Sequence, residues 1–193
     1  MKSVAVFCGS SYGYEPRFRE TAYQVGKTLA REGIEVVYGG TKLGLMGYVA
    51  DGVIDGGGRI KGIIPTLLQQ YPIEHSGLHE IITVGTITER KEMMLRDCEG
   101  FITLPGGFGS LDEIFHVLAQ AQLNVHSKPV GLLNANGFYD ELLAMIRKME
   151  RYGFMRSAAR NILLDATTID ELLDKMRNYQ NPEKKKFFHK DIL

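Results

Sequence analysis

Short apolar runs rich in β-branched residues recur along the chain and predict the strands of one sheet. They occupy residues 4–7, 34–38, 60–64, 80–84, 101–104, 130–133 and 162–164. Most are separated by segments whose apolar residues have the spacing of a helix. Strands that are apolar on both faces and alternate with helices form parallel sheets covered on both sides, so the pattern predicts a doubly wound α/β fold.

No Pro- or Ser-rich linker, repeat or low-complexity tract divides the chain, so we expect a single Rossmann-like domain over residues 1–182. Residues 183–193 begin with a run of charges and form a charged C-terminal tail. A loosely held terminus is the simpler interpretation of this tail, and a partner site is the alternative.

Composition restricts the class of protein. Lys and Arg together number 23, as do Asp and Glu, and 44% of the residues are hydrophobic, which disfavours both disorder and nucleic-acid binding. The longest uncharged segment, 114–127, is shorter than the roughly 20 residues of a membrane span, and the apolar run at 4–8 is too short for a signal peptide. We therefore expect a cytoplasmic protein with a small-molecule partner and no metal, in which Cys8 and Cys98 are buried, reduced thiols.

Glycine is enriched, with 22 of 193 residues, and its clusters follow three predicted strands. Gly9 and Ser10 follow the first strand, a glycine-rich segment at 39–47 follows the second, and another at 105–110 follows the fifth. Ligands of open parallel sheets bind at the carboxyl ends of the strands. We therefore expect the three turns to meet at one ligand-binding edge, although tight packing would explain any single turn.

Glycine-rich turns that lead into helices bring backbone N–H groups to an anion, so these turns predict a phosphate site. The first two would contribute Gly9, Ser10, Gly39, Gly40 and Thr41. Neither the dinucleotide pattern GxGxxG nor the Walker A pattern GxxxxGK[ST] occurs. NAD binding and ATP hydrolysis are therefore disfavoured, and we expect no cofactor.

The segment from Ser110 to Glu113 fits a helix capping box, in which the Ser side chain binds the N3 amide and the Glu side chain returns to the N-cap amide. That interpretation needs no chemistry from Glu113. The alternative rests on position, because a carboxylate one turn above a phosphate site lies close to the sugar attached to that phosphate. The residues alone leave both interpretations open.

The segment from Thr86 to Glu89 fits a second capping box, which places Arg90 and Lys91 in the second turn of the next helix. Cations so close to a helix N-terminus oppose the helix dipole. A nearby anion would explain them, and a solvated face on which Arg90 pairs with neighbouring acids is the alternative.

Two motifs, PGGFGSLDE at residues 105–113 and TERKEMM at 88–94, resemble those of the Lonely Guy family. Its members are cytokinin riboside 5′-monophosphate phosphoribohydrolases and also carry the label lysine decarboxylase. The family pattern PGGxGTxxE, preceded by RKxxM, is matched except that Ser110 replaces the Thr and keeps its hydroxyl. The segments at 38–47 and 121–143 also resemble the family, so the likeness spans most of the chain.

The resemblance implies hydrolysis of the N-glycosidic bond of an N6-substituted adenine nucleoside 5′-monophosphate to free base and ribose 5-phosphate. It implies that Glu113 and Arg90 are catalytic. It further implies that the substrate is bound by Lys91, Gly106, Gly107, Gly109 and Ser110. Cleavage of this bond builds positive charge on the ribose, which calls for a carboxylate and for a polar group that assists the leaving base.

A nucleotide-binding module without turnover is the alternative function. Glu113 separates the two, because a protein that only binds gains nothing from a carboxylate beside an anionic ligand.

The helix predicted from Ser110 to about residue 124 is apolar around most of its circumference, whereas a helix on one face of a sheet needs a single apolar stripe. We expect no other segment of the chain to cover its second side. The helix therefore predicts a homodimer with Phe115, Leu118 or Gln122 in the interface, as is typical of the family that the chain resembles.

Overall fold

The seven predicted apolar runs form seven parallel strands in the computed structural model, which describes residues 1–182. The strands are β1 (Ser3–Phe7), β2 (Glu35–Tyr38), β3 (Ile60–Pro65), β4 (Glu80–Val84), β5 (Gly100–Thr103), β6 (Val130–Leu133) and β7 (Leu163–Ala166). Each predicted run overlaps its strand, which confirms the predicted parallel sheet. The charged tail at 183–193 lies outside the described residues.

The order of the strands reverses in the middle of the sheet. It runs β4-β3-β2-β1-β5-β6-β7, so the chain moves outward from β1 to one edge and then continues from β5 to the other. Phe7 and Thr103, near the carboxyl ends of β1 and β5, are register partners. Ligands of doubly wound sheets bind at such a reversal point, outside the carboxyl ends of the strands.

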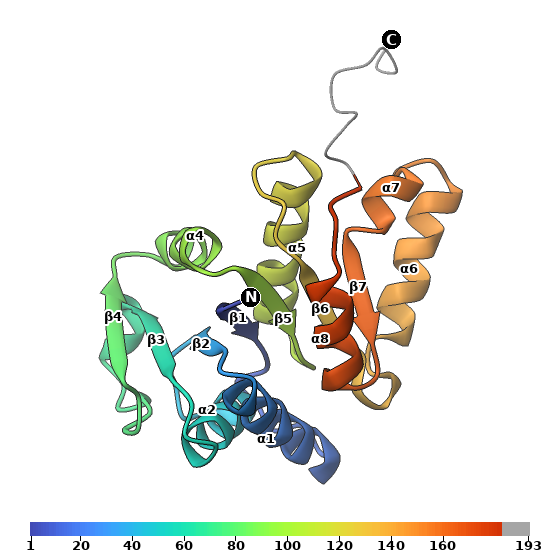
Figure 1. The fold of residues 1–193 in the computed structure, drawn as a ribbon. Helices are drawn as coiled ribbons and strands as arrows, with labels where there is room; N and C mark the ends of the chain where they lie inside the picture. Colours follow the sequence, from blue (N-terminus) through green and yellow to red (C-terminus); the bar gives the residue numbers. More distant parts are fainter. Residues whose placement is uncertain (183–193) are drawn as a thin grey trace.

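Helices cover both faces of the sheet (Figure 1). They are α1 (Pro16–Arg31), α2 (Gly44–Asp55), α3 (Thr66–Gln69), α4 (Ile87–Asp97), α5 (Phe108–Gln122), α6 (Asp140–Arg151), α7 (Ser157–Arg160), α8 (Ile169–Arg177) and a 3₁₀ turn, η1 (Ala135–Gly137). Side chains of α1, α2 and α8 pack with Val4 and Val6 of β1 in one core. Side chains of α4, α5 and α6 pack with Ala5 and Phe7 in the other, so alternate residues of β1 face opposite cores.

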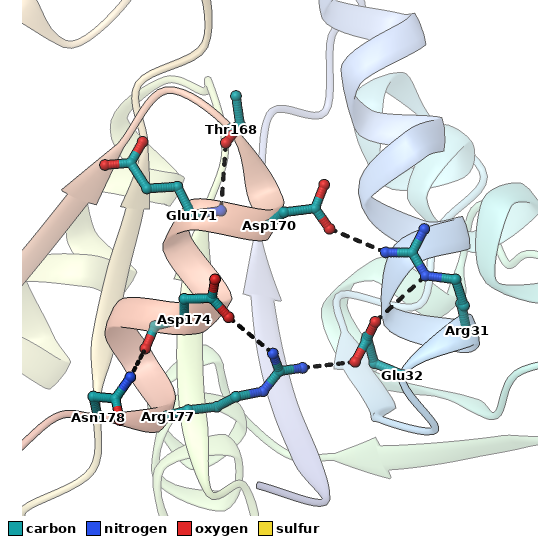
Figure 2. Close-up of polar contacts among 8 residues, drawn as sticks. All are labelled: Arg31, Glu32, Thr168, Asp170, Glu171, Asp174, Arg177 and Asn178. Atoms are coloured by element: carbon teal, nitrogen blue, oxygen red, sulfur yellow. Dashed lines mark hydrogen bonds and ion pairs between the residues drawn. The ribbon is translucent and has the colours of Figure 1, made fainter.

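Ion pairs link α8 to the end of α1 on the protein surface (Figure 2). Arg31 binds Asp170 at 3.0 Å, and Arg177 binds Glu32 at 2.7 Å and Asp174 at 3.1 Å. Exposed pairs of this kind contribute about 0–1 kcal/mol each. The apolar side of α8, which is buried in the first core, therefore contributes more to the position of this helix.

The second side of α5 is covered in part by the same chain, which corrects the expectation that no other segment would do so. Ala121 and Leu118 pack against Ala159 of the short helix α7. Farther around the same helix, Phe115 is 38% exposed, and Leu123, which follows the helix, is 56% exposed. A narrower apolar stripe than predicted therefore faces outward.

Both cysteines are buried free thiols, as the sequence predicts. Within residues 1–182, the helices are all too short or too polar to span a bilayer.

Candidate active site

The three glycine-rich turns meet at one edge of the sheet, as predicted. The Gly9 N–H donates to the carbonyl of Pro105 at 3.0 Å, and the Gly9 carbonyl accepts from the Leu45 N–H at 3.0 Å. Gly44 has a φ of +59°, and a side chain there would overlap the backbone of Ser10. The turn after β1 is therefore held between the other two.

The turn after β2 is mostly buried, so Gly39, Gly40 and Thr41 shape the site from beneath. The Tyr38 hydroxyl donates to the Thr41 carbonyl at 3.3 Å. The Thr41 hydroxyl accepts from the Leu43 N–H at 3.4 Å. Thr41 as a whole is buried, with 3% of its surface exposed. Gly40 has a φ of +77°, which explains why glycine is needed in this turn.

The capping box predicted at Ser110 is wrong. Gly107, with φ −97° and ψ −151°, is the N-cap of α5, and the helix begins at Phe108, so Ser110 is already its third residue. The last residue with extended backbone before α5 is Gly107, so the helix begins two residues before the predicted N-cap at Ser110. The Ser110 side chain is instead buried against Gly106, where any Cβ would overlap its hydroxyl.

The start of α5 borders a cavity of about 270 Å³. Gly106 and Gly107 line it together with Ser10, and the rings of Phe18 and Phe138 form an apolar wall. The first N–H groups of a helix have no acceptor within the helix, and the helix dipole makes this end positive. The cavity therefore opens beside a group of backbone donors suited to a phosphate.

The N-cap predicted at Thr86 is confirmed, whereas the Glu89 side chain returns to the amide of Gly85, one residue before the N-cap amide that the capping box predicts. The Thr86 hydroxyl accepts from the Glu89 N–H at 3.0 Å, and the Glu89 carboxylate accepts from the Gly85 N–H at 2.7 Å. Since α4 begins at the next residue, Arg90 and Lys91 lie in its second turn, as predicted.

Arg90 of α4 forms an ion pair with Glu113 of α5, and the two side chains are 15% and 10% exposed. The Arg90 guanidinium also lies over Gly39, where a Cβ would be 3.5 Å from both terminal nitrogens. Beside this pair, Lys91 binds Asp112 at 2.8 Å. Both cations at the start of α4 are therefore paired with acids, and the Arg90 pair is buried rather than on a solvated face.

Burial raises the pKa of the Glu113 carboxyl above its ordinary value of 4.5, and the Arg90 guanidinium opposes this shift. The adjacent Cys8 thiol is fully buried, and its pKa is raised, first by burial and then by the Glu113 charge. Among the residues that the structure describes, the Arg90 Nε has no hydrogen-bond partner although it is buried. The pair thus combines a carboxylate with an elevated pKa and a guanidinium with one buried nitrogen that has no partner in the described part of the chain.

Sequence reasoning missed Gly44, Asp112 and Cys8 as parts of this site. The motif around residues 38–47 contains Gly44, but only the fold shows that Ser10 packs on it. Over residues 1–182 we find no group of three His, Cys, Asp or Glu side chains placed to hold a metal ion.

The fold and the site define a doubly wound α/β protein with three glycine-rich turns and a buried carboxylate–guanidinium pair at the reversal point of its sheet. A family model described as "Possible lysine decarboxylase" matches residues 46–176. The chain is 43% identical over 176 residues to probable cytokinin riboside 5′-monophosphate phosphoribohydrolase LOGL1 of Oryza sativa subsp. japonica, covering 91% of this chain and 79% of the relative. It is 42% identical over 178 residues to cytokinin riboside 5′-monophosphate phosphoribohydrolase LOG2 of Arabidopsis thaliana, covering 92% and 84%. The chain therefore belongs to this family, the Lonely Guy family, as its motifs indicate.

Solved structures confirm the fold. The molybdenum cofactor binding protein from Rippkaea orientalis superimposes with a TM-score of 0.70 over 92% of this chain and 96% of that chain, at 22% identity. The molybdenum cofactor carrier protein from Chlamydomonas reinhardtii gives a TM-score of 0.69 over 91% and 96%, at 16% identity. At these identities the likeness supports the architecture alone.

Arg90→Ala should make the stability of the protein depend on the charge of Glu113. Without the guanidinium, burial raises the folded pKa of Glu113 further above 4.5, so the folded state holds a proton that the unfolded chain releases. Stability is then retained below about pH 4.5 and is lost as the pH rises toward the folded pKa. Thermal unfolding at about pH 5 and pH 8 measures this loss.

The double variant Arg90→Ala/Glu113→Gln is the control, because it has no carboxylate to bury. It should recover most of the stability that the single variant loses at the higher pH. If both variants lose stability equally across this range, Glu113 is not the group that Arg90 keeps charged.

Proposed function

We propose that the protein hydrolyses the N-glycosidic bond of N6-substituted adenine nucleoside 5′-monophosphates, giving free base and ribose 5-phosphate. The buried Arg90–Glu113 pair beside the N-terminus of α5 is the observation that carries this proposal. Family membership supports it, because relatives with 42–43% identity carry the name cytokinin riboside 5′-monophosphate phosphoribohydrolase.

The 5′-phosphate is bound at the start of α5. Gly107 and Gly109 are exposed there and offer backbone N–H groups, and Ser10 lies across the cavity. Residues four apart in a helix share a face, so Glu113 lies one turn above Gly109 on the same side. A phosphate on the first-turn amides therefore places the attached ribose beside the Glu113 carboxylate.

The other predicted binding residues act on the turns or on the charge of the site. Gly9 links the three turns, and Gly39, Gly40 and Thr41 form the buried turn after β2. Gly106 leaves room for the Ser110 hydroxyl. Lys91 adds positive charge beside the ribose phosphate and is kept in place by Asp112.

The chemistry follows from the charge that develops in the reaction. As the glycosidic bond breaks, the ribose becomes cationic, and the Glu113 carboxylate stabilises it and accepts a proton from the water whose oxygen bonds to the anomeric carbon. The base leaves with the electrons of the broken bond and takes up a proton, so that one water is added overall and Glu113 returns to its ionised form. Arg90 keeps Glu113 ionised in its buried position and donates a hydrogen bond toward the leaving base.

We also propose that the enzyme acts in the cytoplasm as a homodimer. Two buried free thiols suit a reducing compartment. The outward stripe of α5, centred on Phe115 and flanked by Leu118 and Gln122, supplies an apolar surface that a two-fold partner would cover.

Glu113→Gln should leave the protein folded and lower turnover at least a hundredfold, because the amide cannot accept the proton or stabilise the cationic ribose. Release of free base from isopentenyladenosine monophosphate, followed by chromatography, measures the loss. Glu99→Gln is the matched control, since Glu99 precedes the amino end of β5 whereas Glu113 follows its carboxyl end. Near-normal turnover of the Glu113 variant would remove Glu113 from the mechanism.

The enzyme should require the 5′-phosphate. The α5 amides donate charge-assisted hydrogen bonds to the phosphate of the monophosphate, and the nucleoside has no phosphate to accept them. We therefore expect kcat/KM for AMP to exceed kcat/KM for adenosine by at least a hundredfold. Parallel assays of AMP, isopentenyladenosine monophosphate and both nucleosides give this ratio. Equal rates with and without the phosphate would contradict the assignment of the glycine turns.

Light scattering at micromolar concentration should give the mass of two chains. Phe115→Lys places a charge in the proposed interface and should shift the protein to the mass of one chain while the fold is kept. A monomeric wild-type protein, or a variant that remains fully dimeric, would show that this stripe is not the interface.

A further inference from the structure

Tyr139 lies outside the residues assigned to the site, yet its hydroxyl reaches the phosphate-binding turn. The hydroxyl donates to the Leu104 carbonyl at 2.8 Å, and the residue is 3% exposed. Burial raises the pKa of Tyr139, and a hydrogen bond with the backbone of Gly106 lowers it. The hydroxyl therefore contacts the backbone at the residue that precedes Pro105.

The position of Tyr139 is itself fixed by a polar network in the turn between β6 and α6. The Tyr139 N–H donates to the Asn134 side-chain carbonyl at 2.7 Å, and the Asn134 amide donates to Asp140 at 2.7 Å. Gly137, with a φ of +72°, closes the turn between them. The preceding ring, Phe138, packs edge-on against Tyr139 with ring centroids 4.8 Å apart.

Contacts from two sides thus hold the backbone just before α5. From the β1 side, the Gly9 N–H donates to the Pro105 carbonyl and the Phe7 carbonyl accepts from the Leu104 N–H; from the β6 side, the Tyr139 hydroxyl donates to the Leu104 carbonyl. The N–H groups that follow, at Gly107 and Gly109, are the ones that face the phosphate. A change in the backbone at Leu104 would therefore move these donors.

We propose that Tyr139 is a positioning residue for phosphate binding: its hydroxyl holds the Leu104–Gly106 backbone so that the first amides of α5 meet the 5′-phosphate. This inference rests on the proposed function for the identity of the ligand. The turn between β6 and α6 contributes no reacting group. The proposal gives this turn a part in recognition of the phosphate ester.

Tyr139→Phe tests the proposal because it removes one oxygen and keeps the ring. The KM for the nucleoside monophosphate should rise about tenfold, which corresponds to about 1.4 kcal/mol, while kcat changes less than about twofold. The kcat/KM for the corresponding nucleoside, which has no phosphate, should stay unchanged. KM rises while kcat is unchanged when a variant loses a contact that stabilises the bound substrate and the transition state equally.

Tyr179→Phe is the matched control. Its hydroxyl is also buried and has no hydrogen-bond partner within residues 1–182, and the residue follows the C-terminal end of α8. This variant should alter neither KM nor kcat. If Tyr139→Phe lowers only the thermal midpoint, or weakens nucleoside and nucleotide turnover equally, Tyr139 is structural and the proposal fails.

Calorimetric binding of ribose 5-phosphate separates this proposal from the proposed function, because it needs no turnover. About tenfold weaker binding by Tyr139→Phe supports the role of Tyr139 even if the wild-type protein hydrolyses no nucleotide. Equal affinity of the two proteins, or no binding by either, overturns the role of Tyr139 whatever the activity.

Discussion

The rest of the site depends on keeping the Glu113 carboxylate charged in a nearly buried position. Removing a carboxylate from water costs several kcal/mol unless a cation and hydrogen bonds compensate it. Arg90 is the cation that does so, and its guanidinium also lies over Gly39 in the turn after β2. The Thr86 cap places Arg90 in the second turn of α4, and the early start of α5 places Glu113 in the second turn of α5, where the two side chains meet.

The topology of the sheet explains why these groups meet. Arg90 follows β4 at one edge of the sheet, whereas Glu113 follows β5 beside β1, where the strand order reverses. The helix α4 crosses back from β4 to β5 (Figure 1), and the second turn of this helix places Arg90 against Glu113. The glycine-rich turn after β5 and the charged pair therefore both belong to the segment from α4 to α5.

Local patterns in the sequence predict those structural features that depend on neighbouring residues alone. The apolar runs predict all seven strands, and the spacing from Thr86 to Glu89 predicts the start of α4. The same reasoning fails at Ser110, because the pattern SxxE cannot reveal that Gly107 already ends the turn. It also misses α7 as a cover for α5, since four helical residues carry no measurable period.

Contacts between distant residues could not be predicted. The Tyr139 hydroxyl meets Leu104 across 35 positions, and no motif marks that tyrosine as different from the other aromatic residues. The family resemblance implies that Arg90 and Glu113 are both catalytic, but it does not imply that they form an ion pair. The burial of this pair and its position over Gly39 follow from the packing of α4 against α5.

A double-mutant cycle on kcat/KM tests most directly whether Arg90 and Glu113 act as one unit. It compares Arg90→Ala, Glu113→Gln and the double variant with the wild-type enzyme on the same nucleoside monophosphate. Residues that act as a unit have strongly non-additive effects, so the double variant should be no slower than the slower single variant, within about threefold. If the two losses multiply instead, Arg90 and Glu113 contribute independently, and the buried pair is not the basis of catalysis.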